Sequence, residues 1–211
     1  MRNSRFITGW IGAAVITNAV VVTTVSIFSA ESLAAVFVVA LIEGACLGAM
    51  QRTLLHRCSS GVRGWFYATL AGAVAGRIVQ YTLETGPWMP EIYRWPHPVQ
   101  VVAGAGAGLA VGAVMALLQV PALRGHARHT GVWIVARAVS TAASFVVLGL
   151  AQFTLGVPAV TFAEIFCLLV LIAATSGAVG AAIEAPVMLH LLFQSPMQNR
   201  SAARSRECLA N

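Results

Sequence analysis

The chain has 211 residues, of which 58% are hydrophobic and 9% are charged, and its formal net charge is +6. A soluble domain carries about 25% charged residues, so this composition excludes an ordinary soluble protein. Every basic residue is arginine and every acidic residue is glutamate. The lack of lysine excludes a Walker A phosphate loop and a Schiff base, and the lack of aspartate excludes a Ser-His-Asp triad and Asp-rich Mg²⁺ sites.

Apolar residues fall into blocks, each near the roughly 20 residues needed to cross a bilayer core. The six blocks cover residues 7–29, 33–52, 64–84, 99–120, 131–153 and 159–185. We expect all of them to be helices, because the backbone needs internal hydrogen bonds in lipid. The first block follows Arg2 and Arg5 as a signal peptide would, but its apolar core is too long, so we interpret it as a retained anchor. The last can continue as helix to about residue 193, past Pro186, which would kink it.

The arginines outside these blocks indicate an orientation. In a six-span arrangement, one side carries Arg2, Arg5, Arg52, Arg57, Arg63, Arg124, Arg128, Arg200, Arg204 and Arg206. Only Arg94 falls in a loop on the other side. The positive-inside rule therefore predicts that both termini are cytoplasmic. The positive charge is a topology signal, and no nucleic-acid partner is expected, because no soluble domain is available to present a basic face.

Three stretches of the sequence resemble one another, at residues 44–51, 112–119 and 177–184. The shared glycines are offset by 68 and 65 residues, and the stretches end in Gln51, Gln119 and Glu184. A period of this length indicates one supersecondary unit in three copies. We predict an all-α integral membrane protein of three tandem helical hairpins, at about 5–57, 62–125 and 130–193. They would form one domain over 1–193 with pseudo-threefold symmetry, followed by a basic, disordered cytoplasmic tail at 194–211.

Within each hairpin, the outgoing helix opens with Trp-x-x-Ala, at Trp10, Trp65 and Trp133. We interpret these tryptophans as an aromatic belt at the cytoplasmic interface. The returning helices carry small residues at every fourth position, among them Gly44, Gly112 and Gly177. Such ladders allow close helix contact, so we expect the returning helices to meet at a central axis with the outgoing helices around them.

Charged and amide side chains inside the blocks are candidates for a functional role. We expect Gln51, Gln119 and Glu184 to form a polar ring at the cytoplasmic mouth of the axis. Helix rise places Arg137 roughly 9 Å and Glu43 roughly 13 Å from the cytoplasmic edge, which allows an ion pair. Arg77 lies roughly 20 Å deep, where it can pair with Glu164 or Glu84. These groups either bind the helices together or line a path for a polar or anionic ligand.

The loop at residues 84–98 differs from the other loops. It contains four prolines, which should prevent a helix, and the aromatic residues Trp88, Tyr93 and Trp95, which we expect to lie in the outer headgroup layer. These residues form either an ordinary interfacial loop, or a lid or a docking surface for a partner. His126 and His129 have the spacing of metal ligands on a helix, but they lie in an Arg-rich loop, so no metal site is predicted.

Three functions remain open. The leading interpretation is a non-enzymatic accessory or scaffold subunit of a larger membrane assembly, with the lipid bilayer and other membrane subunits as partners. The second is a small transporter, channel or substrate-binding component that uses the polar ring with Glu43 and Arg137. The third is an intramembrane lipid-modifying enzyme, although no catalytic residues or cofactor can be assigned. The Gly…Gln hairpin pattern resembles repeat-built bacterial membrane proteins, which implies location in the inner membrane.

Overall fold

The computed structural model describes residues 2–28, 32–58, 64–124, 129–154 and 162–193, and all regular structure within them is helical. The helices are α1 (Arg2–Phe28), α2 (Leu33–Cys58), α3 (Trp65–Glu84), α4 (Met89–Ile92), α5 (His97–Leu123), α6 (Thr130–Thr154) and α7 (Phe162–Phe193). The predicted tail at 194–211 and His126 lie outside the described residues.

The expected class of helical membrane protein is confirmed at this level. Five helices are long and apolar enough to cross a membrane, namely α1, α2, α5, α6 and α7. The block at 64–84 forms α3, which is not among these five. Its last two turns contain the polar residues Arg77, Gln80 and Glu84.

Two helix boundaries differ from the sequence-based expectation. The loop at 84–98 contains a short helix, α4, with Pro90 in its first turn, and α5 begins at His97 with Pro98 in its first turn. Proline blocks a helix only where its missing N–H or its ring meets the preceding turn, and both prolines avoid this at a first turn. Inside α7, the helix continues past Pro186 to Phe193, as expected.

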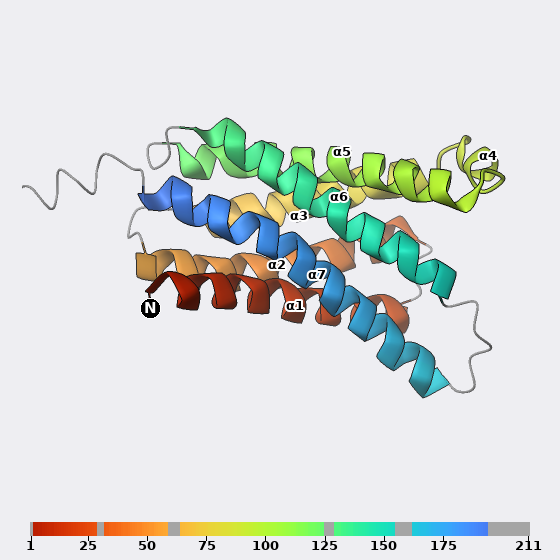
Figure 1. Ribbon diagram of the computed structural model, residues 1–211, viewed down its shortest axis with the longest axis horizontal. Helices are drawn as coiled ribbons and strands as arrows, with labels where there is room; N and C mark the ends of the chain where they lie inside the picture. The colour runs from red at the N-terminus through yellow and green to blue at the C-terminus, as the bar shows by residue number, and fades with distance from the viewer. Residues whose placement is uncertain (1, 29–31, 59–63, 125–128, 155–161, 194–211) are drawn as a thin grey trace, which may run out of the picture.

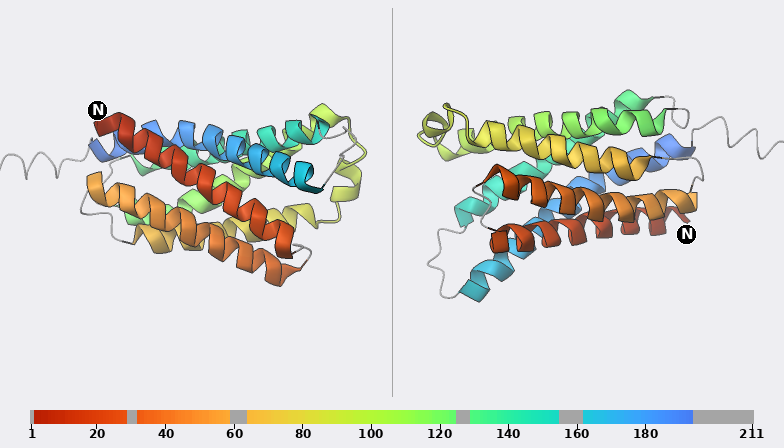
Figure 2. Two further views of the ribbon diagram at one scale, coloured as in Figure 1. Left: turned by 90° about the horizontal axis from the view of Figure 1, so that it is seen from below. Right: turned by 180° about the vertical axis from the view of Figure 1, so that it is seen from behind.

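The six long helices form a closed ring. Each contacts two neighbours, in the order α1, α2, α3, α5, α6, α7 and back to α1. Figure 1 shows them side by side along the long axis, with the N-terminus at one end and α4 at the other. The two further views in Figure 2 show the same arrangement, and the helices diverge towards the α4 end. We call the two ends of the bundle the N-terminal end and the α4 end.

The small-residue ladders have a different role from the one expected. The helices α2, α5 and α7 do not form the centre of the bundle, because each lies between two of the helices α1, α3 and α6. The ladder glycines face these neighbours: Gly44 faces Leu70 of α3, Gly112 faces Arg137 of α6, and Gly177 faces Ala14 of α1. Small residues therefore bring neighbouring helices in the ring together, and the axis is left to other side chains.

The close approach at Gly112 leads to a test with a control in the same helix. A Cβ atom at Gly112 would lie 2.6 Å from the Arg137 carbonyl oxygen and 2.8 Å from the Ala138 Cα, whereas one at Gly104 would have nothing within 4 Å. We expect Gly112→Ala to destabilise the protein by about 1–3 kcal/mol, because backbone cannot move aside as a side chain can. Gly104→Ala should be neutral or stabilising by up to about 1 kcal/mol through helix propensity.

Thermal unfolding of both variants in one detergent, followed by circular dichroism, measures the difference. Equal midpoints for the two variants would contradict the close contact between α5 and α6.

Candidate functional site

The three repeat tryptophans meet inside the bundle near its N-terminal end. Trp10, Trp65 and Trp133 are each 0% exposed. Their ring centroids are 6.3, 6.3 and 5.7 Å apart. The interpretation as an interfacial aromatic belt is therefore wrong: these indoles form the centre of the core, with Phe6, Leu55, Leu123 and Met188 in the same cluster. Tilted and edge-to-face pairs of this kind contribute about 0.5–1.5 kcal/mol each beyond the burial of their area.

Each indole N–H has a polar partner at the end of one of the three repeated stretches. Trp65 Nε1 donates to Gln51 Oε1 at 3.1 Å, and Trp133 Nε1 donates to Gln119 Oε1 at 3.0 Å. Trp10 Nε1 donates to Glu184 Oε2 at 3.4 Å. The first two pairs are each fourteen residues apart, so this constant spacing was a sequence signal for the contact. The third pair joins α1 to α7, and only closure of the ring reveals it.

Two of these three acceptor residues, Gln119 and Glu184, are also contacted from a second helix. Gln119 Nε2 donates to Thr69 Oγ1 at 3.1 Å. At the corresponding place, Arg137 Nη1 lies 2.6 Å from Glu184 Oε1. The residues four after each repeat tryptophan are Ala14, Thr69 and Arg137. A neutral hydroxyl–amide contact in one position is therefore replaced by a charged pair in another.

The Glu184 carboxylate is almost fully enclosed, with 3% of its side chain exposed. Besides Arg137 and Trp10, it accepts a hydrogen bond from the Ser140 hydroxyl. Three donors therefore meet at this one enclosed side chain. Sequence reasoning named Glu184 and Arg137 but missed Ser140 and Trp10 as partners of Glu184. It also missed Thr69 as a partner of Gln119.

The second ion pair joins α2 to α3. Arg77 Nε lies 2.7 Å from Glu43 Oε2, with the two side chains 26% and 14% exposed. Arg77 Nη1 also donates to Gln80 at 2.9 Å, and Gln80 donates to Glu84 at 2.8 Å. A polar chain therefore runs along α3 from Glu43 towards the α4 end.

Both observed pairings differ from those expected, which were Arg137 with Glu43 and Arg77 with Glu164 or Glu84. The expectation used depth along the helix axis alone. In the ring, α2 lies beside α3 and α6 lies beside α7, so Glu43 meets Arg77 and Arg137 meets Glu184. Glu164 is exposed in the first turn of α7, and Glu84 joins Arg77 only through Gln80.

A cavity of about 140 Å³ lies among the six long helices, on the α4 side of the tryptophans. Both ion pairs line it, together with Gln51 and the hydroxyl groups of Ser140, Thr141, Ser144 and Ser176. Its volume is close to that of an engineered cavity of about 150 Å³ that accommodates benzene. It therefore has room for several waters or a solute of roughly six non-hydrogen atoms.

The lining comes from matching positions of the three repeated stretches. The residues just before the shared glycine are Glu43, Val111 and Ser176, and all three line the cavity. The residues three after this glycine are Leu47, Met115 and Gly180, and they do so too. The residues eight after the repeat tryptophans also contribute, namely Asn18, Ala73 and Thr141. The cavity thus lies where equivalent parts of all three stretches face one another.

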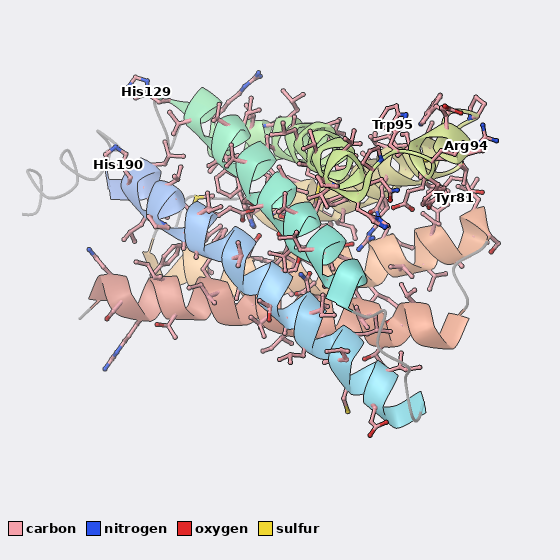
Figure 3. The ribbon with its side chains drawn as sticks, turned by 45° about the vertical axis from the view of Figure 1, so that its right-hand side comes forward. Tyr81, Arg94, Trp95, His129 and His190 are labelled. Atoms are coloured by element: carbon pink, nitrogen blue, oxygen red, sulfur yellow. The ribbon has the colours of Figure 1, made fainter. Side chains whose placement is uncertain are left out.

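The other candidate residues lie at the two ends of the bundle. Trp88, Tyr93 and Trp95 are 44%, 69% and 40% exposed around α4. Figure 3 shows Trp95 and Arg94 near Tyr81 at this end, and His129 and His190 at the opposite end. Within the part of the chain that the structure describes, no group of three or more His, Cys, Asp or Glu side chains comes together to hold a metal ion.

The tryptophan–amide contact predicts a specific effect of Trp65→Phe. The change keeps an aromatic ring in the core but leaves the buried Gln51 oxygen without its donor, so we expect a loss of about 1–3 kcal/mol. The thermal midpoint in detergent measures this loss. Trp95→Phe is the matched control, because this side chain is 40% exposed and should change stability little. Similar midpoints for the two variants would contradict the structural importance of the buried bond.

A double-mutant cycle tests whether the charged pair can be replaced by the neutral one. Arg137→Thr should destabilise the protein by about 3–5 kcal/mol, because it leaves the Glu184 charge buried without its main partner. Adding Glu184→Gln reproduces the Thr69–Gln119 contact of α3 and α5 and should restore most of the loss. Urea or thermal unfolding of the two single variants and the double variant gives the coupling energy. Additive losses would show that the two side chains do not act as a pair.

The site is a polar cavity whose two arginines and two glutamates carry no net formal charge. Two of its lining residues, Gln51 and Glu184, accept hydrogen bonds from the tryptophan cluster. Such a site can hold a small polar solute through charge-assisted hydrogen bonds. In comparisons with known proteins, no family model, no curated protein and no solved structure matches the chain.

Proposed function

We propose that the protein is a six-span bacterial inner-membrane protein of three helical hairpins, a single domain over residues 1–193 with both termini in the cytoplasm. The equivalent bonds of Trp65 with Gln51, Trp133 with Gln119 and Trp10 with Glu184 support a pseudo-threefold arrangement. The matched contacts of Gly44, Gly112 and Gly177 support it independently. The arginines near the N-terminal end of the bundle support the orientation.

In this arrangement, α3 is the sixth membrane span despite its polarity. It lies in the ring between α2 and α5, and its polar side chains Arg77 and Gln80 line the cavity. Its lipid-side residues include Ile78, which is 38% exposed. A span with a polar inner face is compatible with lipid when that face lines a cavity.

The function that the geometry supports best is binding of a small polar solute in the axial cavity, as a transporter or the substrate-binding component of one. The observation that carries this proposal is that two arginine–glutamate pairs and several hydroxyl groups line a cavity inside an apolar bundle. Charged groups within a membrane mark substrate or ion pathways in many proteins. The polar chain from Arg77 through Gln80 to Glu84 continues from the cavity lining towards the α4 end, so we expect a solute to enter from that end.

A role as an accessory or scaffold subunit is the second candidate. The exposed aromatics Trp88 and Tyr93 at the α4 end favour it, because aromatic side chains are enriched in the cores of protein interfaces. They also suit the headgroup layer of a membrane, so this candidate rests on a weaker observation than the cavity does.

Cysteine accessibility tests the cavity and the orientation together. In a background without native cysteines, Ser144→Cys places a thiol in the cavity lining, and Val139→Cys places one on the lipid face of the same helix, where Val139 is 44% exposed. We expect a membrane-impermeant thiol reagent to modify residue 144 in intact spheroplasts, because water reaches it from the outer side. The control at residue 139 should stay unmodified in lipid.

Modification is measured by the mass of the purified protein. Inverted vesicles should give little modification at residue 144, because the tryptophan cluster closes the cytoplasmic side. Modification only in inverted vesicles would reverse the proposed orientation, and no modification from either side would remove the open cavity and with it the proposed function.

A further inference from the structure

One arginine in the cavity has an unused hydrogen-bonding edge. Arg137 donates through Nη1 to Glu184, and its Nη2 meets only the sulfur of Met115, at 3.8 Å. Its Nε is buried and has no hydrogen-bond partner. Among the described residues, Thr17 Oγ1 is the other buried side-chain nitrogen or oxygen without a partner. A buried donor without an acceptor is costly, so a polar group is expected to meet it in the working protein.

The unused edge has the geometry of an oxyanion receptor. The Nε–H and one Nη2–H of a guanidinium are parallel and lie in one plane, which matches the two oxygens of a carboxylate. Met115 is a flexible side chain that can move away from such a group, and it also lines the cavity. The other edge of the guanidinium is held by Glu184, so the ion pair orients the arginine for a ligand.

Packing of the helices alone does not require this charged pair. At the corresponding place between α3 and α5, the neutral Thr69–Gln119 contact performs the same structural role. At the third place, Ala14 offers no side-chain donor at all. Arg137 and Glu184 therefore add a charge that the other two copies of this contact do without, and they add it where the cavity lies.

We infer that Arg137 binds the carboxylate of a small monoanionic solute through its Nε and Nη2 atoms, within the axial cavity. This inference rests on the proposed solute-binding function and names its substrate class. The cavity of about 140 Å³ limits the solute to a short carboxylate of a few carbon atoms. The lining holds two arginines and two glutamates, so a single negative charge is tolerated better than the double charge of a phosphate or sulfate.

Nearby donors complete the binding site without a further charge. The Gln51 side chain lines the cavity, and its oxygen is already occupied by Trp65, which leaves its amide N–H groups for a ligand. The Thr141 hydroxyl also lines the cavity, but it already donates to the Arg137 carbonyl oxygen at 2.8 Å, so it is not a donor for the ligand. The Gln51 amide favours a ligand that accepts hydrogen bonds over one that donates them.

Acetate and acetamide provide a matched pair of probes, because they have the same shape and differ in charge. Titration calorimetry of the purified full-length protein in detergent, at constant ionic strength set with sodium chloride, measures both. We expect saturable binding of acetate in the millimolar range or tighter, and affinity for acetamide at least about tenfold weaker, because hydrogen bonds to a charged group are the stronger ones. Equal affinity for the two probes, or displacement of acetate by chloride at the same concentration, would overturn the inference.

Two variants separate recognition from folding. Arg137→Lys keeps the charge beside Glu184 but lacks the planar pair of donors, and we expect acetate affinity to fall at least about tenfold. The double variant Arg137→Thr with Glu184→Gln restores a neutral contact of the Thr69–Gln119 type, so it should stay folded and lose acetate binding. Unchanged acetate affinity in the folded double variant would exclude Arg137 as the binding residue.

The outcomes distinguish this inference from the proposed function. If residue 144 is modified from the outer side and acetate does not bind, the cavity is open but its solute is not a carboxylate. If acetate binds in wild type and residue 144 is modified only in inverted vesicles, the recognition site stands and the proposed orientation is reversed.

Discussion

An indole N–H that is buried inside a membrane protein has to find its acceptor within the protein, and this constraint organises the bundle. Trp10, Trp65 and Trp133 are fully buried, and each donates to one residue of the set Gln51, Gln119 and Glu184. Each bond joins a different pair of neighbouring helices, and the packed tryptophan rings connect the three pairs to one another. Close glycine contacts then bring the same pairs together over the rest of their length.

The sequence predicted where the helices lie along the chain and which residues are equivalent, but not how the helices are arranged in space. Hydropathy predicted the helices, and the repeated stretches identified Gln51, Gln119 and Glu184 as equivalent. What could not be predicted was which helices are neighbours in the ring. Depth along a helix follows from counting residues, whereas the direction of a side chain around the axis depends on tertiary packing. For this reason Arg137 was assigned to Glu43, although Glu184 on the adjacent helix is its partner.

The tryptophans illustrate a second limit of sequence reasoning. Tryptophan near the end of a membrane helix usually lies at the interface, and that preference led to the wrong interpretation. A more specific signal was the constant fourteen-residue spacing between an amide and a tryptophan, because a buried indole and a buried amide satisfy each other. Where the three stretches of sequence are alike, their residues form the core. Where they differ, as at Ala14, Thr69 and Arg137, only Arg137 adds a charge, and it lines the cavity.

The tryptophan cluster also restricts the type of transport that the proposed function allows. A channel needs a continuous path, yet three mutually packed indoles lie between the cavity and the N-terminal end. Passage would require these rings to separate and their hydrogen bonds to Gln51, Gln119 and Glu184 to break, at a net cost of about 1 kcal/mol for each neutral bond and more at the charged one. Because the three bonds lie in three different helix pairs, separation of the rings would disturb each of these pairs. The geometry therefore favours a binding component, or a carrier in which the tryptophan cluster moves, over an open pore.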